Sequence, residues 1–82
     1  MITGVAVRTP QGEVHALPWG ARHHTIIHKL SAEGEWSSDC VQGFVNEKGQ
    51  FLNRVEAGRA ALESAQIMYL RWPPKLYSED LW

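Results

Sequence analysis

Two pairs of short strands, each followed by a helical segment, limit most strongly what this 82-residue chain can fold into. Residues 2–8 alternate as a β-strand does, residues 10–12 have turn chemistry, and residues 13–17 form a second strand. A helix over residues 21–33 follows, and Gly34 is typical of the position after a helix C-terminus. The first half therefore predicts a strand pair covered by a helix.

The same order recurs in the second half. Residues 41–45 and 50–52 predict a hairpin, and a helix over residues 54–68 follows. Asn53 precedes this helix with Glu56 three residues on, which is close to a capping box. We expect a solvent face that includes Glu56, Arg59, Glu63 and Gln66, and a packing face of Ala57, Gly58, Ala61, Leu62, Ala65 and Met68.

The order β-β-α-β-β-α predicts an α+β fold, a small antiparallel sheet with two helices packed on one face. We expect residues 1–72 to form one compact domain, because a chain of this length has room for a single core. Pro73 and Pro74 end any helix, so residues 73–82 are expected to be an irregular tail. This tail could dock in cis on its own domain or in trans on another chain.

Composition excludes several classes of protein. An apolar content of 44% argues against disorder, and no apolar run approaches a membrane span. A net charge of −1 argues against a nucleic-acid partner, which needs a basic surface. The lone Cys40 cannot form an internal disulfide, and the N-terminus lacks the pattern of a secretory signal. We therefore expect a cytoplasmic protein with no membrane partner.

Four tryptophans in so short a chain have two interpretations. They reinforce a small core, or they form a dimer interface or ligand surface, where Trp and Tyr are enriched. We favour the core for Trp19 and Trp36, and leave the choice open for Trp72 and Trp82.

An anion or nucleotide site is the strongest chemical candidate. Arg54 lies on the packing face at the start of the second helix, where free N–H groups favour phosphate. His23 lies in the middle of the apolar stripe of the first helix. If the helices lie side by side, a ligand could bind a set of basic and histidine residues, namely Arg8, Arg22, His23, His24 and Arg54. In the structural alternative, Arg54 pairs with Glu56 or with the acidic tail, and His23 is a satisfied core residue.

Metal binding and catalysis have weaker signals. His24 and His28 are four residues apart and could chelate zinc with His15 and Cys40, but the motif lacks a hydrolytic Glu. Cys40 could act as a nucleophile, and His23 could act as an acid–base group. We expect no metal, no cofactor and no catalytic residue. Enzymatic activity stays open, and binding without turnover is favoured.

The chain also resembles a family of short proteins encoded by tailed bacteriophages and prophages. The residues that carry the resemblance are Arg22-His23-His24, Gln42-Gly43-Phe44, Gly49-x-Phe51-x-x-Arg54-x-Glu56-Ala57, Gln66-Ile67 and Leu76-Tyr77-Ser78-Glu79-Asp80-Leu81-Trp82. Gln50 and Ala65 depart from the family pattern, in which we expect Arg and Gly. The resemblance implies a phage origin and a place in the cytoplasm of an infected bacterium.

Small phage proteins of this kind often counter host defence, so the resemblance suggests a function by analogy. The first hypothesis is a homo-oligomer that binds and sequesters a small phosphorylated, nucleotide-derived immune signal without turnover. The second is a protein–protein inhibitor of a host defence enzyme or complex, which would use the exposed aromatic residues and the tail. The third is a small phosphodiester hydrolase.

Overall fold

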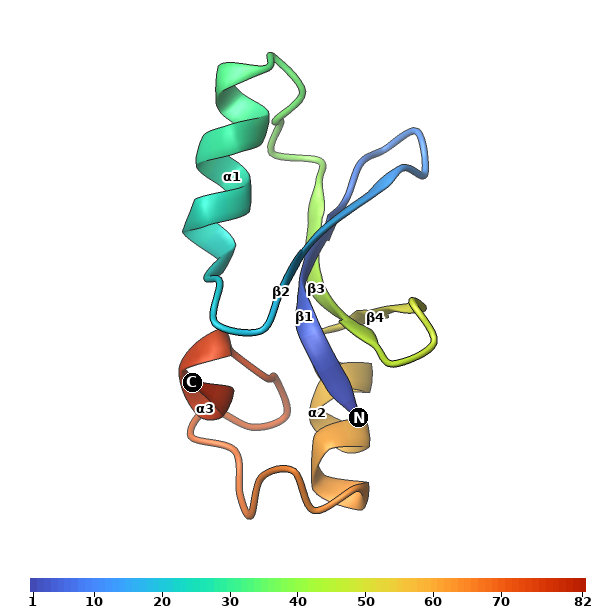
Figure 1. Cartoon of the computed structure of the whole chain (residues 1–82), viewed down its shortest axis with the longest axis vertical. Helices are drawn as coiled ribbons and strands as arrows, with labels where there is room; N and C mark the ends of the chain where they lie inside the picture. The colour runs from blue at the N-terminus through green and yellow to red at the C-terminus, as the bar shows by residue number, and fades with distance from the viewer.

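Four antiparallel strands form one sheet in the order β2-β1-β3-β4 (Figure 1). The computed structural model describes residues 1–82, and the strands are β1 (Ile2–Arg8), β2 (Val14–Pro18), β3 (Val41–Asn46) and β4 (Phe51–Asn53). The central pair, β1 and β3, runs in register from Gly4 opposite Val45 to Arg8 opposite Val41. With α1 and α2 inserted as the sequence predicts, the α+β prediction is confirmed.

The helices are shorter than the sequence predicts. They are α1 (His23–Ala32), α2 (Arg54–Glu63) and α3 (Ser78–Leu81). The short helix α3 lies within the segment expected to be irregular, so that detail of the prediction is wrong. No helix is both long enough and apolar enough to cross a membrane.

The start of α2 is fixed by its own side chains. The side-chain oxygen of Asn53 accepts hydrogen bonds from the main-chain nitrogens of Val55 and Glu56, at 3.0 and 2.8 Å. In return, the main-chain nitrogen of Asn53 donates to the Glu56 carboxylate at 3.0 Å. The predicted capping box is confirmed, and it uses several of the free N–H groups that helix starts otherwise offer to anions.

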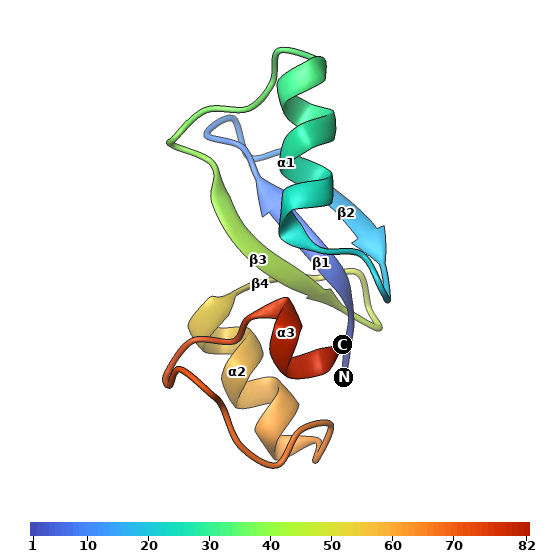
Figure 2. The ribbon, with the colours of Figure 1, turned by 90° about the vertical axis from the view of Figure 1, so that its left-hand side faces the viewer.

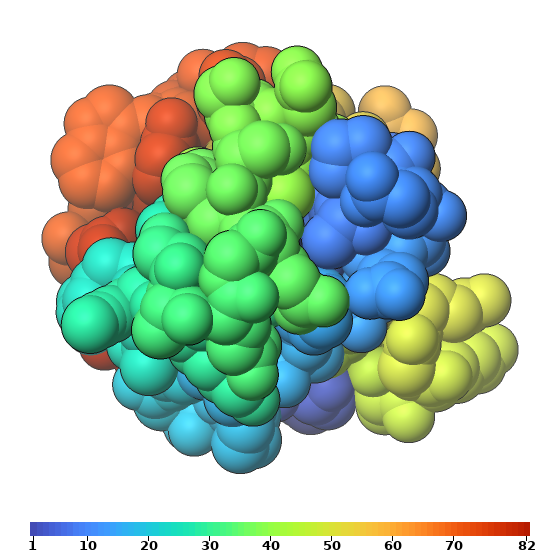
Figure 3. All heavy atoms as spheres, turned by 90° about the horizontal axis from the view of Figure 1, so that it is seen from above, coloured from blue at the N-terminus to red at the C-terminus, as the bar shows by residue number.

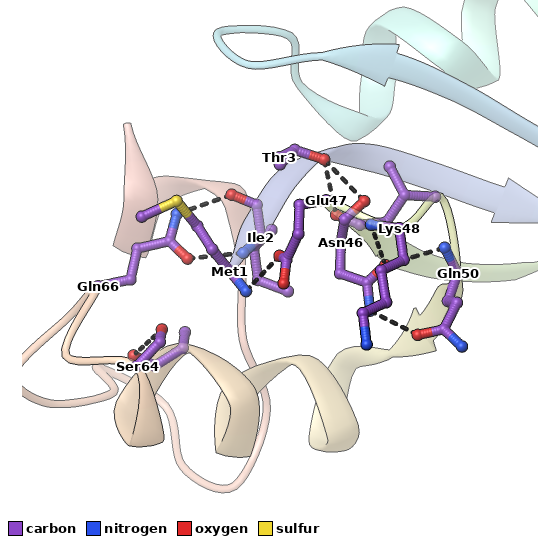
Figure 4. Close-up of polar contacts among 11 residues, drawn as sticks. Met1, Ile2, Thr3, Asn46, Glu47, Lys48, Gln50, Ser64 and Gln66 are labelled. Carbon is purple, nitrogen blue, oxygen red and sulfur yellow. Dashed lines mark hydrogen bonds and ion pairs between the residues drawn. The ribbon is translucent and has the colours of Figure 1, made fainter.

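The end of α2 is closed by main-chain hydrogen bonds, from the Ala65 nitrogen to the Leu62 oxygen at 3.1 Å and from the Gln66 nitrogen to the Ala61 oxygen at 2.9 Å. Beyond this end, Gln66 reaches β1 (Figure 4). Its side-chain amide accepts from the Ile2 nitrogen at 2.7 Å and donates to the Ile2 oxygen at 2.8 Å. Strand β2 pairs with β1 only from Gly4 onward, so the amide takes the place of a neighbouring strand at Ile2. Ala65 has a positive φ of 58° in the turn that brings Gln66 there. The predicted solvent position of Gln66 is therefore wrong.

One core joins the sheet to both long helices and to the tail (Figure 2). In Figure 2, α1 lies over one end of the sheet, and α2 and α3 lie at the other. The buried cluster consists of Ile2, Val5, Val7, Ile26, Leu30, Phe44, Ala57, Ala61 and Leu76. Because Leu76 belongs to this cluster, the C-terminal segment packs on its own chain.

The tryptophans divide between core and surface. Trp36 and Trp82 are partly buried against the core. Trp19, which we expected in the core, is 52% exposed and lies against the Trp82 ring, with ring centroids 4.2 Å apart. Trp72 is also exposed. Trp19 therefore anchors the C-terminal segment rather than filling the core.

Candidate functional site

Arg54 connects α2 to the sheet and to the tail. One guanidinium nitrogen donates to the Leu76 oxygen at 2.9 Å, and another donates to the Gln42 side-chain oxygen at 2.8 Å. The guanidinium also lies over the Tyr77 ring, 4.4 Å from its centroid. Burial lowers the pKa of Arg54, and Tyr77 and Glu79 oppose that shift. The protein thus engages two of the guanidinium nitrogens and covers its plane with Tyr77, so Arg54 is held in place by its own chain.

His23, like Arg54, is held by contacts within the protein. Its side chain is 7% exposed, its Nε2 lies 2.7 Å from the Gly43 oxygen, and its ring meets the Phe44 ring edge to face at 4.9 Å. Burial lowers the pKa of His23 to about 4, against the opposing effect of the Gly43 carbonyl. His23 is therefore neutral at pH 7, and because the Gly43 oxygen accepts, we assign the proton to Nε2.

Gly43 is the point on which these two side chains converge. His23 contacts Gly43, and Arg54 contacts the adjacent Gln42 on β3. A Cβ atom at Gly43 would lie 2.3 Å from the Leu52 oxygen and 2.6 Å from an atom of the Phe51 ring. We call Gln42, Gly43, Phe44, His23 and Arg54 the Gly43 cluster. Two of the five predicted site residues thus come together, but at a closely packed junction.

The other three predicted site residues lie apart from this cluster. Arg22 precedes α1 and donates through Nη2 to the main-chain oxygen of Trp82, while its buried Nη1 has no partner. The Trp82 indole donates to the Ala21 oxygen at 2.7 Å, so Arg22 also lies where the tail is held. His24 is exposed on α1, and the exposed Arg8 lies over the Phe51 ring at 4.9 Å.

A shallow hollow on α1 gathers the exposed basic and histidine side chains of that helix. It measures about 450 Å³ and is lined by His24, Thr25, His28, Lys29 and Ala32. We call it the α1 hollow. Of the predicted site residues, it contains His24.

A groove on α2 is more apolar, and the sequence did not indicate it. It measures about 420 Å³ and is lined by Val55, Arg59, Leu62, Glu63, Leu70, Pro73 and Pro74. We call it the α2 groove. Gly58 lets the returning segment approach α2, because a Cβ there would lie 3.0 Å from the Pro74 oxygen and 3.2 Å from Leu70. Leu62, predicted to pack inward, is 40% exposed because this segment leaves its outer side open.

A polar cluster at the other end of the molecule was also missed. Glu13, His15 and Glu35 bring one ligand atom each to within 4.8 Å of one another. Their separation in sequence hides the cluster, since Glu35 comes from the connection after α1. The sequence suggests His15 as a metal ligand, but together with the histidines of α1 and Cys40.

Comparison with known proteins gives one match. A family model described as phage T4 y16D protein matches residues 1–82. No curated protein and no solved structure matches the chain.

Proposed function

Because the chain belongs to the phage T4 y16D protein family, we propose that it acts in an infected bacterium by binding a host protein through the α2 groove. Membership of a phage family supports the part of the proposal that places the protein in an infected bacterium. The observation that carries the proposal is the apolar lining of the groove, which the chain itself leaves open. A host defence enzyme or complex is the class of partner we propose, so that binding would inhibit it.

The chain segment that supplies one wall of the groove also carries exposed large apolar side chains. Met68 is 92% exposed and Tyr69 is 70% exposed, and Trp72 follows in the same segment. That segment also supplies Leu70, Pro73 and Pro74 to the groove. Exposed aromatic residues and methionine are enriched in protein interfaces, and they bury large apolar areas when a partner covers them.

The charges that line the groove suit a particular occupant. Arg59 and Glu63 lie one helical turn apart and both line it, beside Leu62. We propose a partner segment with a large apolar side chain for the groove, an acidic group toward Arg59 and a basic group toward Glu63. Such flanking charges select partners and orient them.

Sequestration of a phosphorylated nucleotide is the second candidate, and the α1 hollow is the observation that favours it. In the Gly43 cluster, the contacts of Arg54 and the neutral state of His23 leave little to bind a phosphate. In the α1 hollow, His24, His28 and Lys29 are exposed and could contact an anion. For hydrolysis, the expected acid–base residue His23 contacts Gly43 and Phe44 instead.

Two matched charge substitutions separate the candidates. Leu62→Glu places a carboxylate in the α2 groove, and Lys29→Glu places one in the α1 hollow. Circular dichroism checks that each variant folds. The wild type, cross-linked in bacterial lysate, is expected to retain a stoichiometric partner, which is then purified for calorimetry. The proposal predicts that Leu62→Glu weakens this binding at least tenfold, a loss of about 1.4 kcal/mol, and that Lys29→Glu leaves it unchanged.

Three results would overturn the proposal. Retention of the partner by Leu62→Glu would place the interface elsewhere. A nucleotide that raises the melting temperature of wild type and Leu62→Glu, but not that of Lys29→Glu, would favour sequestration. A dimer in light scattering that Leu62→Glu dissociates would identify a second copy of the chain as the occupant.

A further inference from the structure

We propose that Glu13, His15 and Glu35 form a binding site for a divalent first-row metal ion such as Zn²⁺. Glu13 lies just before β2, His15 lies within β2, and Glu35 lies just after α1. The Nε2 atom of His15 is 3.4 Å from a Glu13 carboxylate oxygen and 3.8 Å from a Glu35 carboxylate oxygen. This site is separate from the α2 groove and does not rest on the proposed function.

Two of the three separations between these atoms are close to those of metal ligands. Zinc bonds to nitrogen and oxygen are about 2.0–2.2 Å long, so two ligands of a tetrahedral zinc lie roughly 3.3–3.6 Å apart. The separation from Glu13, 3.4 Å, lies within this range, and the separation from Glu35, 3.8 Å, lies just above it. A small rotation of the exposed Glu35 side chain would complete the geometry.

The state of His15 is the second observation that points to a cation. The side chain is 31% exposed, but its Nε2 atom is shielded from solvent, makes no hydrogen bond, and lies within ion-pair distance of both carboxylates. A shielded polar nitrogen that makes no hydrogen bond is unfavourable, and a metal ion bound between it and the carboxylates would give it a partner. One neutral imidazole with two carboxylates is a donor set that zinc accepts, and two negative charges beside it favour a cation.

The fold holds two of the three ligands from their backbones. The main-chain nitrogen of Thr9 donates to the main-chain oxygen of Glu13 at 2.8 Å. The Thr9 hydroxyl accepts from the main-chain nitrogen of Glu13 at 3.2 Å. The Glu35 nitrogen donates to the Leu30 oxygen at 2.8 Å, which fixes Glu35 against the end of α1. The backbones of Glu13 and Glu35 therefore start from defined positions, and only their exposed side chains have to be ordered on binding.

Open space beside the cluster provides for a further ligand. A polar hollow of about 420 Å³ is lined in part by Glu13, Glu35, Thr9, Gln11 and Ser37. Figure 3 shows the β1–β2 turn and the segment after α1 side by side at this end of the molecule. Water could complete a coordination sphere of three protein ligands. A metal here would clamp the hairpin to the end of α1.

The test is a Zn²⁺ titration of the tag-free full chain by calorimetry, with the Co²⁺ absorption spectrum as a second readout. The wild type is expected to bind one ion and to melt at a higher temperature with Zn²⁺ present. His15→Gln and Glu35→Gln are each expected to weaken binding at least tenfold. Glu35 is exposed in a connection, so its variant tests the site even if His15→Gln fails to fold.

The control is His28→Ala, because His24 and His28 on α1 could chelate zinc by themselves. Unchanged binding by this variant supports the proposed site. Loss of binding in His28→Ala with retention in Glu35→Gln would overturn the proposal. Absence of binding by the wild type at about 0.1 mM Zn²⁺ would overturn it as well.

Discussion

The Gly43 cluster and the Glu13–His15–Glu35 cluster each contain a histidine and charged side chains, but they differ in whether the histidine makes a hydrogen bond. In the first cluster, the ring nitrogen of His23 and two guanidinium nitrogens of Arg54 make hydrogen bonds of 2.7–2.9 Å to oxygens of the sheet and the tail. In the second, the nearest charged atoms are 3.4 and 3.8 Å from His15 Nε2, and that atom makes no hydrogen bond. The first cluster holds the fold together, whereas the second is left to bind something else.

This difference shows what decides whether a polar side chain is available to a ligand. A buried donor or acceptor that loses its protein partner destabilises the fold by about 1–3 kcal/mol. A ligand that displaced the partners of Arg54 or His23 would therefore have to compensate for this loss through its own contacts. An exposed carboxylate carries no such cost. Residue type therefore indicates the possible chemistry, and the number of satisfied contacts decides between structure and function.

The largest effect should follow from Gly43→Ala. The new Cβ would overlap the Leu52 oxygen and the Phe51 ring, at 2.3 and 2.6 Å, and the Leu52 contact is main chain that cannot rotate away. We expect a loss of at least about 3 kcal/mol in the free energy of unfolding, measured by urea denaturation.

Gly49→Ala is the matched control for Gly43→Ala. Its Cβ would meet nothing within 4 Å, although its φ of +76° strains any residue other than glycine. We expect a cost of about 1 kcal/mol there. If Gly43→Ala costs no more than Gly49→Ala, the Gly43 cluster is not tightly packed and the comparison fails.

The next effect is a dependence of stability on pH that comes from His23. Its pKa is lowered from 6.5 to about 4 in the folded chain, so the unfolded chain binds more protons between these values. Stability is full above about pH 6.5 and is lost as pH falls toward 4, by up to about 3 kcal/mol. Urea denaturation across pH 4–7 measures this slope.

His23→Gln provides the reference for that slope, because its amide can donate to the Gly43 oxygen without titrating. The difference between wild type and variant removes the contributions of the carboxylates. Equal slopes for the two proteins would mean that His23 titrates normally and is open to solvent.

Arg54→Ala should have a smaller effect. The substitution removes the bonds to the Leu76 oxygen and the Gln42 side chain, together with the contact with Tyr77. We expect a loss of about 2–3 kcal/mol, which in a domain of this size lowers the melting temperature by roughly 8–24 °C.

Arg59→Ala, an exposed substitution on the same helix, is the control and should change stability by less than about 0.5 kcal/mol. If Arg54→Ala has the same melting temperature as Arg59→Ala, Arg54 does not hold the tail. Its role would then be in binding, as the sequence suggested.

Much of the fold could be predicted because its signals are local. Alternation within residues 2–8 gave β1 with its bounds, and Asn53 with Glu56 gave the start of α2. The position of the Gln66 side chain beyond α2 could not be predicted in this way. It depends on Gln66 reaching Ile2, 64 residues earlier in the chain, and no local pattern reports such a contact.

The candidate site could be predicted less well for the same reason. Helical spacing correctly aimed His23 inward and placed Arg54 at a helix start. It could not show that Leu76 and Gln42 would take the donors of Arg54. Glu13 and Glu35 meet only because a turn and a connection fold to the same end of the sheet.

The smallest effect should follow from Glu35→Gln without metal. Glu35 is exposed and its carboxylate lies 3.8 Å from His15, and exposed pairs of this kind contribute about 0–1 kcal/mol. Neutralising one of two neighbouring carboxylates also relieves repulsion, so we expect a change within about 0.5 kcal/mol in urea denaturation. A loss above about 1.5 kcal/mol would show that Glu35 supports the fold, as Arg54 does. A small change, together with weakened Zn²⁺ binding, would separate a cluster that binds from a cluster that folds.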